Sequence, residues 1–241
     1  MIKTNRHIFK ITDLKKKSVR ITQIDGKLPN LALMKLSHWH KSRGDKVYFT
    51  QSVKKDLFEP DYDIVYGSTI FNFSSKKTEL FKKQFPNAII GGTGTENKKT
   101  VEDVIDLQRY ECFDYDIYPD FQNSIGFSQR GCRLACKFCV VGDKEGRNNI
   151  HNIWRGDPYP RNIILLDNDF FGQKGWQEKA QEMIDGKFKV NFNQGINIRL
   201  IDEQSCETLP YINYRDVKFK NKRIYTAWDN IGDEKIFMKG V

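Results

Sequence analysis

Three of the five cysteines lie within eight residues, as Cys132, Cys136 and Cys139. Thiolates at spacings of four and three residues can surround one small inorganic centre. A four-iron cluster normally takes four cysteine ligands, so three neighbouring cysteines leave one iron with an open position. A substrate or cofactor can coordinate a metal at such a position. The spacing therefore predicts a [4Fe–4S] cluster that acts on a second molecule.

A zinc site is the alternative for the same cysteines, with a distant fourth ligand from Cys112, His151 or Cys206. Structural zinc sites usually combine two closely spaced pairs of ligands, and this sequence has no second pair. The chain also lacks an apolar run of signal-peptide or membrane-spanning length, which predicts a cytoplasmic protein without a membrane segment. Clustered cysteines in that compartment favour metal binding over disulfides.

Strands and helices alternate along the first half of the chain, ahead of these cysteines. The pattern predicts strands at 19–24, 47–50, 64–70 and 88–90, with a helix at 30–44 and another from Ser74 or Ser75 to Pro86. Such alternation is typical of a parallel sheet covered on both faces. Residues 1–113 are therefore expected to form a small doubly wound, Rossmann-like domain.

A second α/β series follows a linker predicted at 114–123, where the sequence is polar and aromatic and lacks periodicity. Strands are predicted at 125–128, 163–166, 190–193 and 224–228. A stripe of Trp176, Ala180 and Met183 marks one intervening helix, and Asp202 opens another. Residues 124–241 are thus expected to form a partial (β/α) barrel of about four strands. Its open edges would require more chain or a partner chain to cover them.

The cysteine motif resembles that of the radical S-adenosylmethionine (SAM) superfamily. A predicted strand precedes Cys132, and the aromatic Phe138 stands directly before Cys139. The resemblance implies that the three cysteines hold a [4Fe–4S] cluster whose remaining iron binds the amino and carboxyl groups of SAM. Reductive cleavage of SAM to a 5′-deoxyadenosyl radical would then start the reaction, with electrons from a flavodoxin- or ferredoxin-like reductant. The protein would position the cofactor and exclude water.

The same resemblance implies further contacts to SAM. Phe138 would pack near the adenine. Asp167, Asn168 and Asp169 end a predicted strand where the family places a segment against the amino group of SAM. The usual Gly-Gly-Glu is replaced here by Asp-Asn-Asp, similar to the form in methylthiotransferase-like and cobalamin-type members. Arg199 follows the next strand and would meet the SAM carboxylate or form a surface salt bridge.

A small doubly wound domain ahead of such a barrel resembles the subgroup with an N-terminal cobalamin (B12)-binding-like domain. Gly91, Gly92 and Thr93 follow a predicted strand and are a candidate ligand loop. The Asp-x-His-x-x-Gly motif of cobalamin mutases is absent, so cobalamin binding stays open. His38 and His40 lie on the predicted helix at 30–44 and are expected to be partly exposed.

The formal charge of +9 invites a nucleic-acid partner, but the lysines are scattered along the sequence. The substrate therefore stays open among a small molecule, a peptide and RNA, as does the reaction among hydrogen abstraction, methylation and methylthiolation. Two other functions are carried forward. One is a truncated or catalytically incomplete iron–sulfur subunit, and the other is a non-catalytic zinc module associated with RNA.

Overall fold

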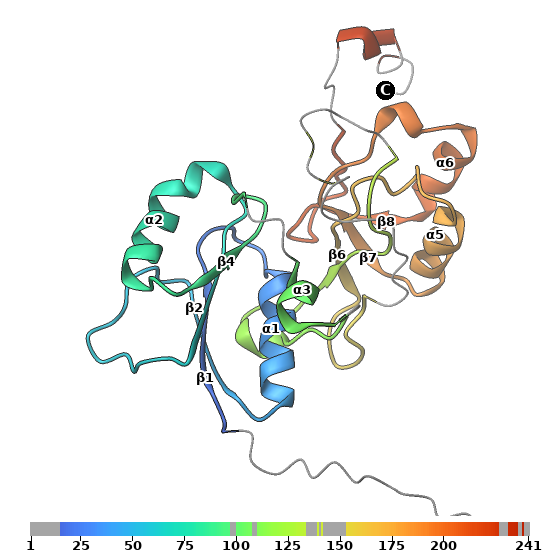
Figure 1. Cartoon of the computed structure of the whole chain (residues 1–241). Coiled ribbons are helices and arrows are strands. Elements are labelled where there is room, and N and C mark those ends of the chain that lie inside the picture. The colour runs from blue at the N-terminus through green and yellow to red at the C-terminus, as the bar shows by residue number, and fades with distance from the viewer. Residues whose placement is uncertain are drawn as a thin grey trace, which may run out of the picture. The chain divides into compact units, whose positions relative to one another are not determined.

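The computed structural model describes residues 15–96, 100–107, 110–133, 139, 141, 153–226, 231–235 and 238. The chain divides into two units, Met1–Ile117 and Tyr118–Val241. Each unit contains a parallel four-stranded sheet with helices (Figure 1). The α/β class predicted from the alternation of strands and helices is therefore confirmed.

The first unit contains β1 (Ser18–Gln23), α1 (Leu31–Ser42), β2 (Lys46–Thr50), β3 (Ile64–Ser68), the 3-10 helix η1 (Asn72–Ser74), α2 (Ser75–Gln84), β4 (Ile89–Gly91), α3 (Val101–Ile105) and η2 (Tyr115–Ile117). Its strand order is β2-β1-β3-β4. The contacts of two successive residues of β3 show which helix covers which face of the sheet. Tyr66 of β3 reaches His40 of α1, whereas Gly67 of β3 lies under Phe81 of α2. Successive strand residues point to opposite faces, so α1 and α2 cover opposite faces of the sheet.

The second unit contains β5 (Ser124–Gly126), β6 (Asn162–Leu165), α5 (Trp176–Asp185), β7 (Lys189–Phe192), η3 (Ile198–Leu200), α6 (Glu203–Thr208), η4 (Leu209–Tyr211), β8 (Asn213–Tyr214) and η5 (Ile231–Asp233). Its strand order is β5-β6-β7-β8. The predicted stripe of Trp176, Ala180 and Met183 is buried against Val190 and Phe192 of β7. Figure 1 shows α5 and α6 on the same side of this sheet.

The predicted strand at 224–228 is wrong as the fourth strand of the second sheet. That position is taken by β8, which pairs Asn213 and Tyr214 with β7. Two residues are too few to show the alternation that identifies a strand in a sequence. Tyr225, within the predicted strand, instead contacts the loop after β7, because the Ile196 amide donates to the Tyr225 carbonyl at 2.8 Å. Residues 227–230 lie outside the described residues.

Two residues have contacts that the sequence did not indicate. Asp114, placed in the predicted linker, is tied to α1, because its carboxylate accepts from Ser37 Oγ at 2.5 Å and pairs with Lys41 Nζ at 2.7 Å. His40 is buried rather than partly exposed, between Asp45 and Tyr66, and burial lowers its pKa in spite of Asp45. His38 is partly exposed, as expected.

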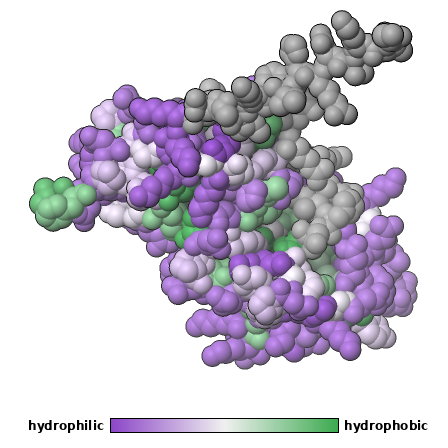
Figure 2. Space-filling view, turned by 90° about the horizontal axis from the view of Figure 1, so that it is seen from below, coloured by the Kyte–Doolittle hydropathy of each residue, from purple (hydrophilic) through white to green (hydrophobic). Residues whose placement is uncertain are grey.

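The described surface is mainly hydrophilic, and Figure 2 shows hydrophobic residues on one face as separate areas. Several of the most exposed large hydrophobic side chains belong to the first unit, among them Leu57, Phe58 and Phe73. None of the helices in the described part of the chain combines the length and the apolar character that a membrane span requires.

Candidate functional site

The carboxyl ends of β5, β6 and β7 bring three loops to one edge of the second sheet. Because the strands are parallel, Gly126, Leu165 and Phe192 stand in register. The pairing continues just beyond the strands, since the Leu166 amide donates to the Gly126 carbonyl at 2.8 Å. The loop that leads to the cysteines therefore leaves the sheet beside the Asp167–Asp169 segment, and the Arg199 segment follows the next strand.

The loop after β5, residues 127–133, presents the first cysteine. Cys132 is partly buried and Cys139 is exposed. Gly131 has a φ of 86°, which glycine adopts without the strain of a side chain. Gln173 Nε2 donates to the Gly131 carbonyl at 3.1 Å, so the turn before Cys132 is fixed from the β6 side. Cys136 and Phe138 lie outside the described residues.

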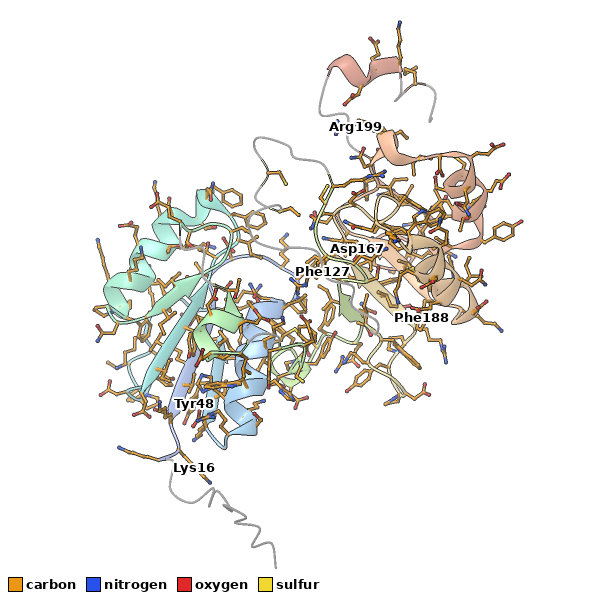
Figure 3. All side chains as sticks on the ribbon, turned by 45° about the vertical axis from the view of Figure 1, so that its right-hand side comes forward. Lys16, Tyr48, Phe127, Asp167, Phe188 and Arg199 are labelled. Atoms are coloured by element: carbon orange, nitrogen blue, oxygen red, sulfur yellow. The ribbon has the colours of Figure 1, made fainter. Side chains whose placement is uncertain are left out.

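Asp167 is the main connection between the cysteine loop and the sheet. Its carboxylate accepts from the Ser128 amide at 2.7 Å, Ser128 Oγ at 2.6 Å and the Gln129 amide at 3.0 Å. Asp167 is 4% exposed, and Figure 3 shows it beside Phe127, the neighbour of Ser128. Both carboxylate oxygens are thus used within the protein. The structure gives Asp167 a positioning role toward the loop, rather than a free acceptor for a ligand.

Asp169 is arranged differently, because one of its two oxygens has no hydrogen-bond partner. Oδ2 accepts from the Arg133 amide at 3.2 Å, next to Cys132, while Oδ1 is buried and unpaired. The residue is 2% exposed. A β-carbon on Gly172 would lie 2.0 Å from Asp169 Oδ1, so glycine is required for the carboxylate to occupy this place. Asn168, between the two aspartates, is partly exposed.

Gln129 was not identified from the sequence, and it adds a second unpaired group to the cysteine loop. It is 2% exposed, and neither its Nε2 nor its Oε1 has a hydrogen-bond partner. A buried polar group without a partner costs about 1–3 kcal/mol. Gln129 lies in the loop of Cys132 and Asp169 contacts that loop. A polar ligand that supplied hydrogen-bond partners to both residues would relieve this cost. The signal available in the sequence was only the position of Gln129 three residues before Cys132.

The chemistry of these atoms is compatible with SAM, the cofactor that the family resemblance implies. An unpaired carboxylate oxygen matches an amino group, and a side-chain amide both donates and accepts. Among the described residues, no three His, Cys, Asp or Glu side chains are grouped as a complete metal site. Cys136, one of the three predicted ligands, is outside that set. Asp169, with its unpaired Oδ1, therefore keeps an acceptor that a ligand could use, whereas both oxygens of Asp167 are already engaged.

Arg199 forms an ion pair within the second unit. Its Nη1 lies 3.3 Å from Asp233 Oδ2 in η5, and its backbone amide donates to Asn197 Oδ1 at 3.1 Å. The Arg199 side chain is 27% exposed. Of the two roles expected for Arg199, the salt bridge is therefore the one formed in this structure. Arg199 lies in η3, and Figure 3 shows it away from Asp167.

The glycine loop in the first unit packs closely against the loop after β3. The Gly94 amide donates to the Thr69 carbonyl at 3.1 Å, and Thr93 Oγ1 donates to the Ile70 carbonyl at 2.7 Å. Gly92 has a φ of 105°, and a β-carbon there would lie 2.1 Å from the Thr69 carbonyl oxygen. The close approach of the Thr69 backbone thus explains why position 92 is a glycine. No ligand is needed to explain this part of the candidate loop at Gly91, Gly92 and Thr93.

Asp25 organises the same edge of the first sheet and was missed by the sequence reasoning. Its carboxylate accepts from the Ile70 amide at 2.7 Å, the Phe71 amide at 3.0 Å and Thr69 Oγ1 at 2.7 Å. Burial alone would raise the pKa of Asp25, but these hydrogen bonds outweigh it and hold the pKa below the usual 3.8. The only sequence signal was an aspartate between a strand and Gly26.

We expect Asp25→Asn to lower the free energy of unfolding of the first unit by about 1–3 kcal/mol at neutral pH. The ionised form is the one stabilised in the fold, so this contribution is complete above pH 3.8 and is lost as the pH falls through the lower folded pKa. The difference between wild type and variant in urea midpoint should therefore shrink on acidification. A difference that is constant with pH would contradict a role for the charge.

Comparisons with protein-family models, with curated proteins and with solved structures found no match. The function is therefore inferred from the residues and their geometry.

Proposed function

We propose that the second unit is the catalytic part of a radical SAM enzyme. In this proposal Cys132, Cys136 and Cys139 hold a [4Fe–4S] cluster, which supplies the electron that cleaves SAM to methionine and a 5′-deoxyadenosyl radical. The electron would come from a flavodoxin- or ferredoxin-like reductant. The radical would begin hydrogen abstraction, methylation or methylthiolation of a substrate. The observation that carries the proposal is the cysteine spacing on a loop that directly follows a strand of a parallel sheet.

The arrangement at the end of β6 supports the proposal. Asp167 anchors the start of the cysteine loop and Asp169 contacts the residue after Cys132. The unpaired Oδ1 of Asp169 would accept from the amino group of SAM, and the Gln129 amide would meet another polar group of the cofactor. Phe138 is proposed to lie near the adenine. Arg199 is left out of the cofactor site, since it is paired with Asp233.

The finer architecture belongs to the same proposal. Helices on both faces of the first sheet suit a doubly wound, B12-binding-like domain. A parallel sheet with α5 and α6 on one side suits a partial radical SAM barrel, open at its edges unless another chain covers them. Cobalamin is not included, because His40 is buried between Asp45 and Tyr66 and close packing explains Gly92.

The test begins with protein purified and reconstituted without oxygen. We expect about four irons and four sulfides per chain, and release of 5′-deoxyadenosine from SAM under dithionite. Cys132→Ala should abolish both, whereas Cys206→Ala, which removes an exposed cysteine outside the motif, should leave both unchanged.

Two results would overturn the proposal in different ways. A full cluster without SAM cleavage would favour the incomplete iron–sulfur subunit. One zinc per chain after anaerobic purification, with no cluster on reconstitution, would instead favour the zinc module. Each result is read from metal, sulfide and nucleoside analysis, so it needs no knowledge of the substrate.

A further inference from the structure

Lysines that are scattered in the sequence gather along α2 in the first unit. Lys76 and Lys77 lie in its first turn and Lys82 and Lys83 in its last, and all four are exposed. The loop after β2 adds the exposed Lys54 at the end of the helix, because the amide of the next residue, Lys55, donates to Gln84 Oε1 at 3.3 Å. The ammonium group of Lys55 itself pairs with Asp61 at 2.6 Å. Glu79 is the one acidic residue within α2. One face of the unit thus carries a local excess of positive charge.

Two exposed aromatic rings stand at the start of this helix. Phe73 is 82% exposed and Phe71 is 42% exposed, and their rings stack with centroids 4.9 Å apart and an interplanar angle of 10°. The 3-10 helix η1 runs into α2 through Ser75, which has helical backbone angles. Lys76 and Lys77 follow Phe73 by three and four residues, so they are its neighbours on the helix surface.

The exposed aromatic pair is held on a rigid framework. The Phe71 amide donates to Asp25 Oδ2 at 3.0 Å, and the Ile70 amide before it donates to Asp25 Oδ1 at 2.7 Å. A β-carbon on Gly94 would lie 2.8 Å from the Phe71 backbone, so the two loops are in close contact. Burial of a phenylalanine side chain stabilises a fold by about 1.5–3 kcal/mol, and the exposed Phe73 lacks most of this stabilisation. Exposure of this kind on a fixed loop is typical of a binding surface.

We propose that this surface, formed by Phe71, Phe73 and the lysines of α2, binds single-stranded nucleic acid. Lysine ammonium groups neutralise phosphates, and an exposed aromatic face stacks with a base of any sequence. The formal charge of +9 favours association with a polyanion. An acidic polypeptide would pair with the lysines but would gain nothing specific from a parallel aromatic pair. A second copy of this chain would bring like charges together. This inference does not depend on the chemistry proposed for the second unit.

The first test is binding of the full chain to a labelled single-stranded oligouridylate of about twelve nucleotides, measured by fluorescence anisotropy over a range of salt concentrations. Phe73→Ala should weaken binding roughly tenfold and leave the salt dependence unchanged, because it removes stacking and no charge. Lys76→Gln with Lys77→Gln should weaken binding and reduce the slope of log affinity against log salt by about 1.4. These side chains are exposed, so the thermal unfolding of the variants should match wild type.

A double variant in the second unit is the matched control. Lys218→Gln with Lys220→Gln removes the same charge from another exposed segment and should leave affinity and slope as in wild type. Equal weakening by both lysine pairs would show diffuse attraction to the whole basic protein and overturn the proposal. So would an absence of binding at low salt. Full competition by polyglutamate, with no effect of Phe73→Ala, would assign the surface to an acidic polypeptide instead.

Discussion

Asp167→Ala is expected to release the cysteine loop from the sheet and to prevent stable cluster assembly. The substitution removes all three acceptor contacts to Ser128 and Gln129 at once. Hydrogen bonds to a charged group contribute about 1.5–3 kcal/mol each, so the ordered position of residues 127–133 should be lost even where the unit stays folded. After reconstitution we expect iron and sulfide well below half of the wild-type content.

A measurement on the protein without its cluster separates positioning from catalysis. Alkylation of Cys132 by iodoacetamide, followed by peptide mass spectrometry, reports how freely the loop opens. We expect the rate to rise about tenfold or more in Asp167→Ala, since a loss of 1.4 kcal/mol in local stability gives a factor of ten. Asp167→Asn should be intermediate, because its oxygen still accepts one amide while its NH₂ group faces the other donors.

Asp216→Ala is the control for general destabilisation of the second unit. Asp216 is also a buried aspartate that holds a loop, accepting from the Lys220 amide at 2.9 Å and from Asn221 Nδ2 at 2.8 Å. These hydrogen bonds lie within residues 216–221, apart from the cysteine loop. If Asp216→Ala accelerates Cys132 alkylation as much as Asp167→Ala does, the effect is a loss of overall stability and the positioning role is refuted.

The roles of Asp167 and Asp169 show where sequence reasoning reached its limit in the candidate site. Their location at the end of β6 followed from the strand pattern, and the parallel sheet confirms that this end lies beside the cysteine loop. The difference between them, with Asp167 anchoring the loop and Asp169 keeping an unpaired oxygen, did not follow from the sequence. It depends on which carboxylate meets the amides of residues 128 and 129, and on the space left by Gly172, neither of which is encoded in local periodicity.

The fold shows a similar limit. Strands of four or more residues with a clear apolar pattern, such as β1 and β6, were predicted within one or two residues. The two-residue β8 was missed, because its assignment depends on pairing with β7 and not on its own pattern. Buried polar residues were missed for the same reason. Lys35, 4% exposed, reads as surface in the sequence but pairs with Glu102 and Glu111.

Arg20→Met is expected to lower the free energy of unfolding of the first unit by about 3–5 kcal/mol. Arg20 lies within β1 and is completely buried. Its Nη1 pairs with Glu59, its Nη2 donates to the Ser52 carbonyl at 2.7 Å, and its guanidinium lies 4.4 Å from the centre of the Phe85 ring. Without the arginine, the Glu59 carboxylate, whose side chain is 14% exposed, keeps its charge without its cation.

The size of the effect follows from what Arg20 holds in place. The segment between β2 and β3 has no helix or strand of its own, and it exposes Leu57 at 89% and Phe58 at 91%. Such a loop has little apolar burial with which to fix itself. Arg20 reaches it from the sheet at Ser52, near its start, and at Glu59, in its second half, so two points of the segment depend on one side chain.

Glu59→Gln in the Arg20→Met background tests whether the loss arises from an uncompensated charge. Gln keeps an acceptor for Tyr62 OH, which donates to Glu59 at 2.8 Å, and removes the buried negative charge. The double variant should therefore be more stable than the sum of the two single losses predicts, by about 1–3 kcal/mol. Urea midpoints and hydrogen exchange of the β1 amides measure this coupling. Strict additivity would mean that the loss does not arise from the charge left on Glu59. A loss below about 1 kcal/mol in Arg20→Met would refute the anchoring role altogether.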